Sequence, residues 1–524
     1  MAGIYKYTPA LQAPETLKST LIGRDETLKT IVRVLRNASK GGSLSHLLLI
    51  GPKGIGKTHM LRTIYHCLKG EIDVMGIGKY RDSFVPVIFS EEEYITSAIK
   101  FLRLCIEYLK SERTDVKISN DLIRPDLDER QKELIIDFVK NFRKDSGRIL
   151  LLLVDNFNEI IETFTDEDQS LLREILMTSE SVLLIGTAPT LFNAIVNHGE
   201  PFYNFFEIEW LHEISFDDTK NLLEKLAELE QRQDLLRVIE EKEGKLRAIY
   251  ELSGGNPRLI ISFYQIMTER EITSVEETFQ RMLDEMTPYF SARMKDLSPQ
   301  QREIMDVIAQ ADTLLTPTEL ARRSGIPVNQ VNAQIKRLEE MGYLYKVTGR
   351  KRKGVLYDVK ERLFSLWRQM RVEAGRRRLG FIIKLIEIWF APEEIHEDMN
   401  LIIKQQLYIR DFKRSKKKAK EYLKDALDCI SHAGGEKEAF EVFAEAFKGG
   451  LLKGRIEAVR EALEVIKETP YEDLKRGLHP FYVTIEYLDS RDDAIFERLK
   501  EEERTIVSEM IKAVEGKKKG KKKR

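Results

Sequence analysis

Four residues near the start of the chain have the types and spacing of a phosphate-binding loop. The pattern G-x-x-x-x-G-K-[ST] is met by Gly51, Gly56, Lys57 and Thr58. Glycines let consecutive backbone N–H groups curl around a phosphate, and a following helix adds the positive end of its dipole. The preceding apolar run Leu47–Ile50 predicts a buried strand, and the stretch after the loop predicts a helix. The alternative is a chance match in a glycine-containing loop.

The loop residues have distinct expected roles. Lys57 is expected to reach the β- and γ-phosphates of a nucleotide, and the Thr58 hydroxyl to be a ligand of Mg²⁺. The predicted cofactors are therefore ATP or ADP, with Mg²⁺. The residues expected to contact the nucleotide here are Gly51, Pro52, Lys53, Gly54, Ile55, Gly56, Lys57, Thr58 and His59.

An aspartate at the end of an apolar run is the second candidate. The continuous apolar run Ile149–Val154 is typical of a central parallel strand buried on both faces, and Asp155 follows it directly. Asp155 is expected to hold Mg²⁺ together with Thr58; the alternative is an aspartate that caps a helix. Asn156 comes next, and Glu159 lies four residues after Asp155.

Five apolar runs predict the strands that position these side chains. They are 47–50, 84–89, 149–154, 182–186 and 205–211, and helical patterns separate them. Such alternation predicts an α/β fold with a parallel five-stranded sheet. Gly51–Thr58, Asp155 and Thr187 all follow strands, so they should meet at the carboxyl edge, where ligands bind. The polar stretch 111–128 predicts an exposed insertion.

The second half of the chain predicts helices and one small hairpin. Residues 298–338 contain three short helical patterns, and two strand patterns, 343–347 and 355–359, follow them. This order resembles a winged helix-turn-helix. The wing tip holds four consecutive cations, Arg350, Lys351, Arg352 and Lys353, which with Asn329 and Gln330 are the candidate contacts to double-stranded DNA. The alternative is a winged helix that acts as an intramolecular clamp.

The C-terminal region predicts helices and a charged tail. Helical patterns cover 379–388, 419–430, 436–447 and 455–466, with breaks at Gly434-Gly435 and Gly449-Gly450, and no fixed repeat period is found. Such helices are candidates for binding a protein partner. Seven of the last eight residues are lysine or arginine, which predicts a disordered tail.

Composition limits the class of protein. The chain has 524 residues and a net charge of −1, so several domains are expected and no overall field favours nucleic acid. Its three cysteines lie far apart and no apolar stretch is long enough to cross a bilayer. A cytoplasmic protein without a membrane partner is therefore expected.

Two motifs around the loop resemble known ATPases. Residues 21–28 (LIGRDETL) resemble the box that lies against the adenine in AAA+ initiator ATPases and STAND ATPases, so Gly23 and Arg24 are assigned to the nucleotide site. Thr27 stands at that box's usual glutamate. The stretch 253–258 (SGGNPR) resembles the G-x-P lid motif of STAND proteins and the sensor 2 of initiators. The resemblance implies that Pro257 and Arg258 face the nucleotide; otherwise they belong to a plain capped helix.

The same resemblance assigns two further roles and covers about residues 21–370. Thr187 resembles sensor 1, which detects the γ-phosphate, although it also suits a simple strand end. Many relatives carry Asp-Glu, where the Glu polarises the attacking water, but this chain has Asp155-Asn156. An amide cannot act as a general base, so Glu159 is the candidate substitute and slow hydrolysis is expected. The domains that we expect are an N-terminal arm (1–20), an ATPase core (21–211), a helical lid (212–293), a winged helix (294–372), an all-α domain (373–515) and a disordered tail (516–524).

Three functions remain open from the sequence. The first is a slowly hydrolysing, nucleotide-gated regulatory switch of the signalling or defence type. The second is an initiator-like DNA-binding ATPase for replication or mobile-element transactions, whose winged helix holds duplex DNA while ATP controls assembly of a homo-oligomer. The third is a scaffold that loads a partner and in which hydrolysis hardly matters.

Overall fold

The structure is a computed structural model. It describes residues 9–89, 95–111, 116–124, 128–241, 246–247, 250–251, 253–269, 275–295, 297–348, 355–390 and 435–521. The chain divides into two compact units. Met1–Leu236 and Gly255–Tyr264 form the first, and Arg237–Gly254 and Gln265–Arg524 form the second. The predicted lid is therefore shared between the two units. The winged helix and the all-α region, predicted as separate domains, belong to one unit.

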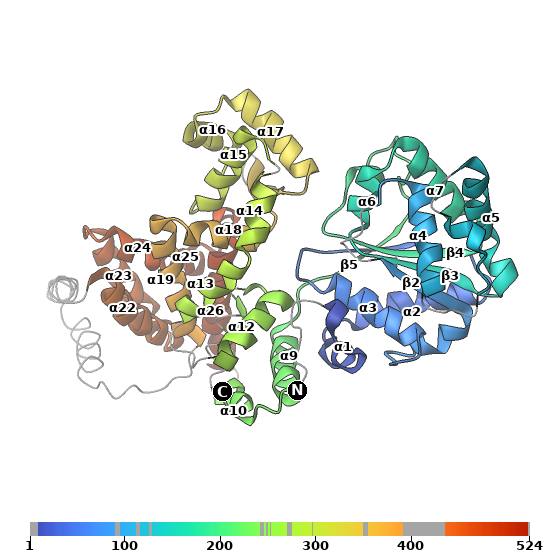
Figure 1. The fold of residues 1–524 in the computed structure, drawn as a ribbon. Coiled ribbons are helices and arrows are strands. Elements are labelled where there is room, and N and C mark those ends of the chain that lie inside the picture. The colour runs from blue at the N-terminus through green and yellow to red at the C-terminus, as the bar shows by residue number, and fades with distance from the viewer. Residues whose placement is uncertain are drawn as a thin grey trace. The chain divides into compact units, whose positions relative to one another are not determined.

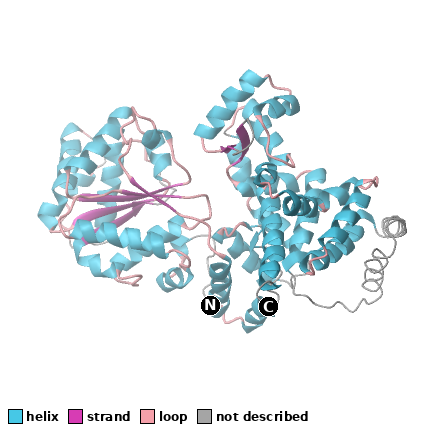
Figure 2. Ribbon diagram, turned by 180° about the vertical axis from the view of Figure 1, so that it is seen from behind, coloured by secondary structure: helices cyan, strands magenta, loops and turns pink. Residues whose placement is uncertain are grey.

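The first unit is built on a parallel sheet of five strands, as predicted (Figures 1 and 2). The strand order is β2-β3-β4-β1-β5. Their bounds are β1 Leu47–Ile50, β2 Phe84–Phe89, β3 Ile149–Val154, β4 Val182–Ala188 and β5 Glu207–Trp210. Strands β1, β3 and β4 are buried along their whole length because helices cover both faces. Pro86 is accommodated because β2 is an edge strand.

Two helical layers cover the sheet (Figure 1). On one face pack α2 (Asp25–Ser39) and α3 (Lys57–Leu68), with η2 (Ile77–Ser83) beside them. The other face is covered by α4 (Ala98–Ser111), α5 (Glu129–Ser146), α6 (Phe157–Thr163) and α7 (Asp166–Thr178). The short α8 (Asn193–Val196) follows β4. Part of the predicted exposed insertion is packed, because Leu122 in η3 (Asn120–Ile123) is buried.

The described part of the predicted N-terminal arm belongs to this unit. Residues 9–20 form η1 (Pro9–Leu11) and α1 (Pro14–Thr20), which contact α3. Leu17 on α1 is fully buried. Burial of this side chain holds the segment on the ATPase core, so residues 9–20 of the predicted N-terminal arm pack against the core.

The helices after the sheet are α9 (Phe216–Leu229), α10 (Gln233–Glu241), α12 (Pro257–Glu269), α13 (Val275–Glu285) and α14 (Thr287–Lys295). Ser215 caps the start of α9, because its side chain accepts a hydrogen bond from Asp218 N. Pro257 is the first residue of α12, where its missing N–H costs nothing. None of the described helices is long and apolar enough to cross a bilayer.

The winged helix in the second unit has the predicted elements (Figure 2). Its helices are α15 (Pro299–Gln310), α16 (Pro317–Ser324) and α17 (Val328–Glu340), followed by β6 (Leu344–Thr348) and β7 (Val355–Val359). The two strands pair antiparallel. Capping boxes begin α15 at Ser298 and α16 at Thr316, and Gly325 ends α16 in the left-handed conformation.

The remaining described elements are all helical. They are α18 (Arg362–Met370), α19 (Glu373–Phe390), α22 (Gly435–Leu452), α23 (Ile456–Lys467), α24 (Glu472–Gly477), α25 (His479–Ser490), η4 (Asp493–Arg498) and α26 (Glu501–Lys521). The predicted helix 419–430 lies outside the described residues.

Two predictions about this region were wrong. Gly449-Gly450 do not break a helix, since α22 continues to Leu452. A Cβ at residue 450 would lie 2.7 Å from Val459 Cγ2, so this glycine allows α23 to pack closely. Residues 516–521 were expected to be disordered, but they continue α26, because helix propagation from a packed segment offsets the repulsion of like charges.

Candidate functional site

The phosphate loop joins β1 to α3 as predicted, and its lysine is held on the loop itself. Lys57 Nζ donates to Gly51 O at 2.7 Å and to Pro52 O at 3.2 Å. Lys57 is only 8% exposed, so its ammonium is kept within the loop by carbonyl acceptors. The side chain begins in the first turn of α3, where the helix dipole also favours an anion. The lysine is therefore placed to exchange carbonyl oxygens for phosphate oxygens.

Three predicted residues meet at the carboxyl edge of the sheet. Thr58 Oγ1 donates to Asp155 Oδ2 at 2.5 Å, and Thr187 Oγ1 donates to Asp155 Oδ1 at 2.6 Å. Strand β4 lies between β1 and β3, and this order brings Thr187 between the loop and Asp155. Asp155 and Thr187 are buried. The hydroxyl of Thr58 and the carboxylate of Asp155 are oxygen donors of the kind that Mg²⁺ prefers.

Asn156 and Glu159 lie side by side at the next turn. Asn156 has φ of 46° and ψ of 48°, a left-handed conformation that asparagine tolerates. This turn begins α6 and places Asn156 Nδ2 3.2 Å from Glu159 Oε1. Asn156 N donates to Thr187 Oγ1 at 3.0 Å, which links this turn to the Asp155 cluster. Glu159 is exposed, so its carboxylate is accessible to water.

Arg24 is placed behind the phosphate loop. Its Nη2 donates to Ile55 O at 2.6 Å, and its Nη1 donates to His212 O at 2.7 Å. Burial lowers the pKa of Arg24, and this is opposed by Glu213 and Asp218. The guanidinium therefore orients the loop backbone and ties it to the segment that leads into α9.

The imidazole ring of His59 bonds to α1 and not to the phosphate loop. His59 Nε2 lies 2.7 Å from Leu17 O on α1, and burial lowers the pKa of the ring. A neutral ring bonded to a carbonyl has no charge to offer a phosphate. His59 can still direct its backbone N–H toward a phosphate, because this group lies in the first turn of α3.

The start of α12 contacts the phosphate loop directly. Arg258 N donates to Gly54 O at 3.2 Å, and Asn256 Nδ2 donates to Lys53 O at 3.3 Å. The close approach requires glycine in the loop, because a Cβ at residue 54 would lie 2.7 Å from Arg258 Cβ. The start of α12 therefore lies beside the loop, and the role of the Arg258 side chain at the nucleotide stays a prediction. Asn256 had no assigned role in the sequence, although an asparagine before a first-turn proline is a helix-cap signal.

The outer face of the winged helix is exposed and polar. Asn329 and Gln330 are exposed at the start of α17, and Gln330 Oε1 accepts from Gln300 Nε2 at 3.0 Å. Asn329, Asn332 and Lys336 are spaced by three and four residues, so they share one exposed stripe of the helix. The spacing alone would have identified Lys336 as a further candidate. The predicted wing cations Arg350–Lys353 lie outside the described residues.

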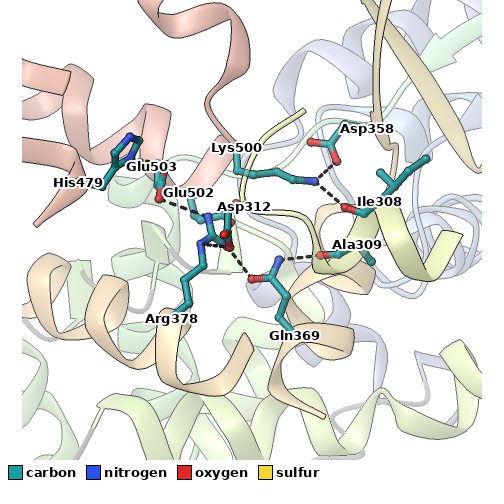
Figure 3. A network of polar contacts seen from close by, with 10 residues as sticks. All are labelled: Ile308, Ala309, Asp312, Asp358, Gln369, Arg378, His479, Lys500, Glu502 and Glu503. Atoms are coloured by element: carbon teal, nitrogen blue, oxygen red, sulfur yellow. Dashed lines mark hydrogen bonds and ion pairs between the residues drawn. The ribbon is translucent and has the colours of Figure 1, made fainter. Parts of the chain in front are cut away.

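The winged helix is fixed to the C-terminal helices by buried charges (Figure 3). Lys500 Nζ donates to Asp358 Oδ1 at 2.5 Å and to Ile308 O at 3.0 Å. Burial raises the pKa of Asp358, against the opposing effect of Lys500. Lys500 precedes α26, whereas Asp358 lies on β7 and Ile308 on α15. This ion pair therefore joins the hairpin to the start of α26.

A second group of charges surrounds Arg378 on α19 (Figure 3). Arg378 lies 3.3 Å from each of three carboxylates and donates to Gln369 Oε1 at 2.7 Å. The carboxylates are those of Asp312, which follows α15, and of Glu502 and Glu503 on α26. Gln369 Nε2 in turn donates to Ala309 O at 2.9 Å. We call the Lys500 and Arg378 groups together the ionic junction.

The fold and the site define a P-loop nucleotide-binding domain joined to a winged helix. Comparison with family models agrees, since residues 20–185 match the AAA ATPase domain. Residues 297–345 match the winged helix-turn-helix DNA-binding model. The protein thus carries an AAA ATPase domain followed by a winged helix-turn-helix domain and a helical C-terminal region.

Individual relatives are distant. An uncharacterized HTH-type transcriptional regulator of Methanocaldococcus jannaschii is 22% identical over an alignment of 363 residues, which covers 65% of this chain and 88% of the relative. A Walker-type ATPase of Pyrococcus abyssi has a TM-score of 0.48 at 14% identity, covering 67% of this chain and 96% of that one. The ORC1 protein of Aeropyrum pernix, solved in complex with DNA, has a TM-score of 0.38 at 16% identity, covering 72% and 98%.

Proposed function

We propose that this protein is a slowly hydrolysing ATPase that works as a nucleotide-gated switch. The observation that carries the proposal is the meeting of Lys57, Thr58, Asp155 and Thr187 at the carboxyl edge of the sheet, with the start of α12 on the same loop. Lys57 binds phosphate oxygens, and Thr58 and Asp155 would hold a Mg²⁺ that neutralises phosphate charge. Thr187 senses the terminal phosphate through its bond to Asp155.

The test of nucleotide binding is Lys57→Ala. Loss of a charge-assisted contact, worth roughly 1.5–3 kcal/mol, should weaken ATP binding by more than tenfold. The affinity is measured by calorimetric titration of the full chain with ATP and Mg²⁺, and circular dichroism checks the fold. Lys40→Ala, which removes a lysine at the end of α2, is the matched control. An unchanged affinity in folded Lys57→Ala would refute the proposal.

The slow hydrolysis that we propose follows from Asn156 and the exposed Glu159. Glu159→Gln should lower turnover by roughly a hundredfold if Glu159 is the base, because general-base catalysis contributes about 10²–10⁴-fold. Asn156→Glu should raise turnover by placing a carboxylate on the strand end. Phosphate release is measured under saturating ATP. Equal turnover in the parent and both variants would exclude this account of the water-activating group.

A second candidate, an initiator-like DNA-binding ATPase, is favoured by the exposed polar stripe of α17. Asparagine side chains suit adenine edges in the major groove, and Lys336 suits a phosphate. Binding of duplex DNA, and the size of the particle, are measured with and without ATP and Mg²⁺. DNA binding that requires ATP favours the initiator-like role, whereas an ATP-dependent change of oligomer without DNA affinity favours the switch.

A further inference from the structure

The carbonyl groups of the phosphate loop are held by donors from three parts of the chain. Lys57 donates to Gly51 O and Pro52 O. The next three carbonyls accept from side chains or backbone far away in sequence: Lys53 O from Asn256 Nδ2, Gly54 O from Arg258 N, and Ile55 O from Arg24 Nη2. A peptide unit whose C=O is held on one side directs its N–H to the other. These donors therefore help to set which way the loop N–H groups point.

Asn256 makes two bonds that a single amide can make together. Its Oδ1 accepts from Arg258 N at 3.0 Å, which caps α12, while its Nδ2 donates to Lys53 O at 3.3 Å. The residue is only 5% exposed, so water does not compete freely for either group. The capping bond fixes the amide plane, and that plane then presents Nδ2 to the loop.

We infer that Asn256 is a positioning residue of the nucleotide site, which holds the phosphate loop in its binding shape and couples it to the start of α12. The inference rests on the proposed nucleotide binding. Coupling between two sites is reciprocal, so a nucleotide that favours the held loop must also stabilise the start of α12. Asn256 thus transmits occupancy of the loop to the lid segment through Lys53 O, without touching the nucleotide.

Two variants separate this role from simple helix capping. Asn256→Ser keeps an oxygen that can accept from Arg258 N, but it removes the amide donor to Lys53 O. Asn256→Asp keeps the shape and the cap and turns the donor into a carboxylate oxygen that repels the carbonyl. Thr165→Ala, which removes the cap of α7, is the control for loss of a cap elsewhere in the same unit.

The experiment uses the full chain with ATP and Mg²⁺, and measures affinity and hydrogen exchange of residues 257–264. Loss of one hydrogen bond should weaken ATP binding by roughly three- to tenfold in Asn256→Ser and by more in Asn256→Asp. Both variants should lose the protection that ATP gives to the start of α12 in the parent. Thr165→Ala should keep both the affinity and the protection of the parent.

The outcomes distinguish this inference from the proposed function. If folded Asn256→Ser binds ATP as the parent does and α12 gains the same protection, Asn256 is only a cap and the inference is wrong. If that happens while Lys57→Ala abolishes binding, the proposed function still stands. A parent that binds no ATP would overturn both. Should Asn256→Asp fail to fold, Asn256→Ser alone decides.

Discussion

The phosphate loop is held by the start of one helix and the winged helix by two helices, and the contacts have opposite chemistry. The loop meets α12 through neutral hydrogen bonds from Asn256 and Arg258 N to Lys53 O and Gly54 O. The winged helix meets α19 and α26 through the ionic junction, whose Lys500 and Arg378 are almost fully buried. Neutral hydrogen bonds of this kind contribute about 1 kcal/mol each to stability, so they can be broken and replaced by other hydrogen bonds.

A buried charge behaves differently. Removing one partner leaves an uncompensated ion in a medium that cannot solvate it, which costs several kcal/mol. We therefore expect movement at the loop and rigidity at the junction. We propose that the winged helix and the C-terminal helices respond to a signal as one body, while α12 responds to the nucleotide. The following predictions test that difference, from the largest expected effect to the smallest.

Breaking the junction should destabilise the second unit strongly. Asp358→Ala leaves Lys500 buried without its carboxylate, and we expect a loss of roughly 3–5 kcal/mol in the free energy of unfolding. Denaturant unfolding, followed by hydrogen exchange in β6, β7 and α26, measures the loss. Glu472→Ala removes the acid of an exposed pair with Lys475 and should leave the stability nearly unchanged.

The double variant Asp358→Leu with Lys500→Met sharpens this test. It removes both charges together, so it should recover most of the stability lost in Asp358→Ala. A stability of Asp358→Ala within about 1 kcal/mol of the parent would mean that the junction is not a rigid anchor.

The two units should respond to pH in opposite directions through His46 and His479. Burial lowers the pKa of His46 to about 4, although its bond to Leu176 O opposes this. Below pH 6.5 the unfolded chain binds a proton that the folded ring resists, so the first unit loses about 2 kcal/mol by pH 5. For His479, burial would lower the pKa, but the ion pair with Glu503 outweighs it and raises the pKa. Its contribution is full below pH 6.5 and is lost as pH rises through the folded pKa.

Hydrogen exchange in each unit between pH 4.5 and 8 measures these slopes. His46→Gln should flatten the acid slope of the first unit only, and His479→Gln should flatten the alkaline slope of the second unit only. The electrostatic difference between the units would be contradicted if His46→Gln flattened the slope of the second unit and His479→Gln that of the first. It would also be contradicted if both variants showed the same dependence of stability on pH.

Arg258 tests whether the neutral contact carries a signal. Arg258→Ala keeps the backbone N–H that donates to Gly54 O, so ADP should still bind. We expect ATP affinity to fall by no more than about tenfold, roughly 1.4 kcal/mol, and the ATP-specific protection of α9 and α12 to disappear. Arg237→Ala, on α10, is the control. Identical protection in the parent and Arg258→Ala would make Arg258 an ordinary surface residue.

The smallest effect is expected on the exposed face of α17. Lys336→Ala should reduce the slope of log affinity for duplex DNA against log salt concentration by about 0.9, the value for one phosphate contact. Lys475→Ala removes the same charge from α24 and should leave the slope unchanged. If both variants reduce the slope equally, the positive charge acts at a distance and α17 is not the DNA-binding face.

Much of the first unit could be predicted from the sequence because its signals are local. Apolar runs of four to seven residues gave the positions of the strands, and the glycine and lysine spacing of the loop marked its place between β1 and α3. The winged helix was equally readable, since capping residues and a hairpin pattern follow one another in order.

Only the tertiary structure decided which groups are contacted by Asn256, Arg24 and His59. Each of these side chains bonds to a backbone carbonyl that is 31 to 203 positions away in the sequence. Every residue has a backbone carbonyl, so no residue type in the sequence identifies the acceptor. The ionic junction is a stronger case. In the sequence, the charged run that contains Lys500, Glu502 and Glu503 is typical of the solvated start of a helix. Only packing against α15, α19 and β7 buries these side chains away from water. Local residue types therefore determined the elements and the chemistry of the loop, whereas long-range packing decided which charges are buried and which residues hold the loop in place.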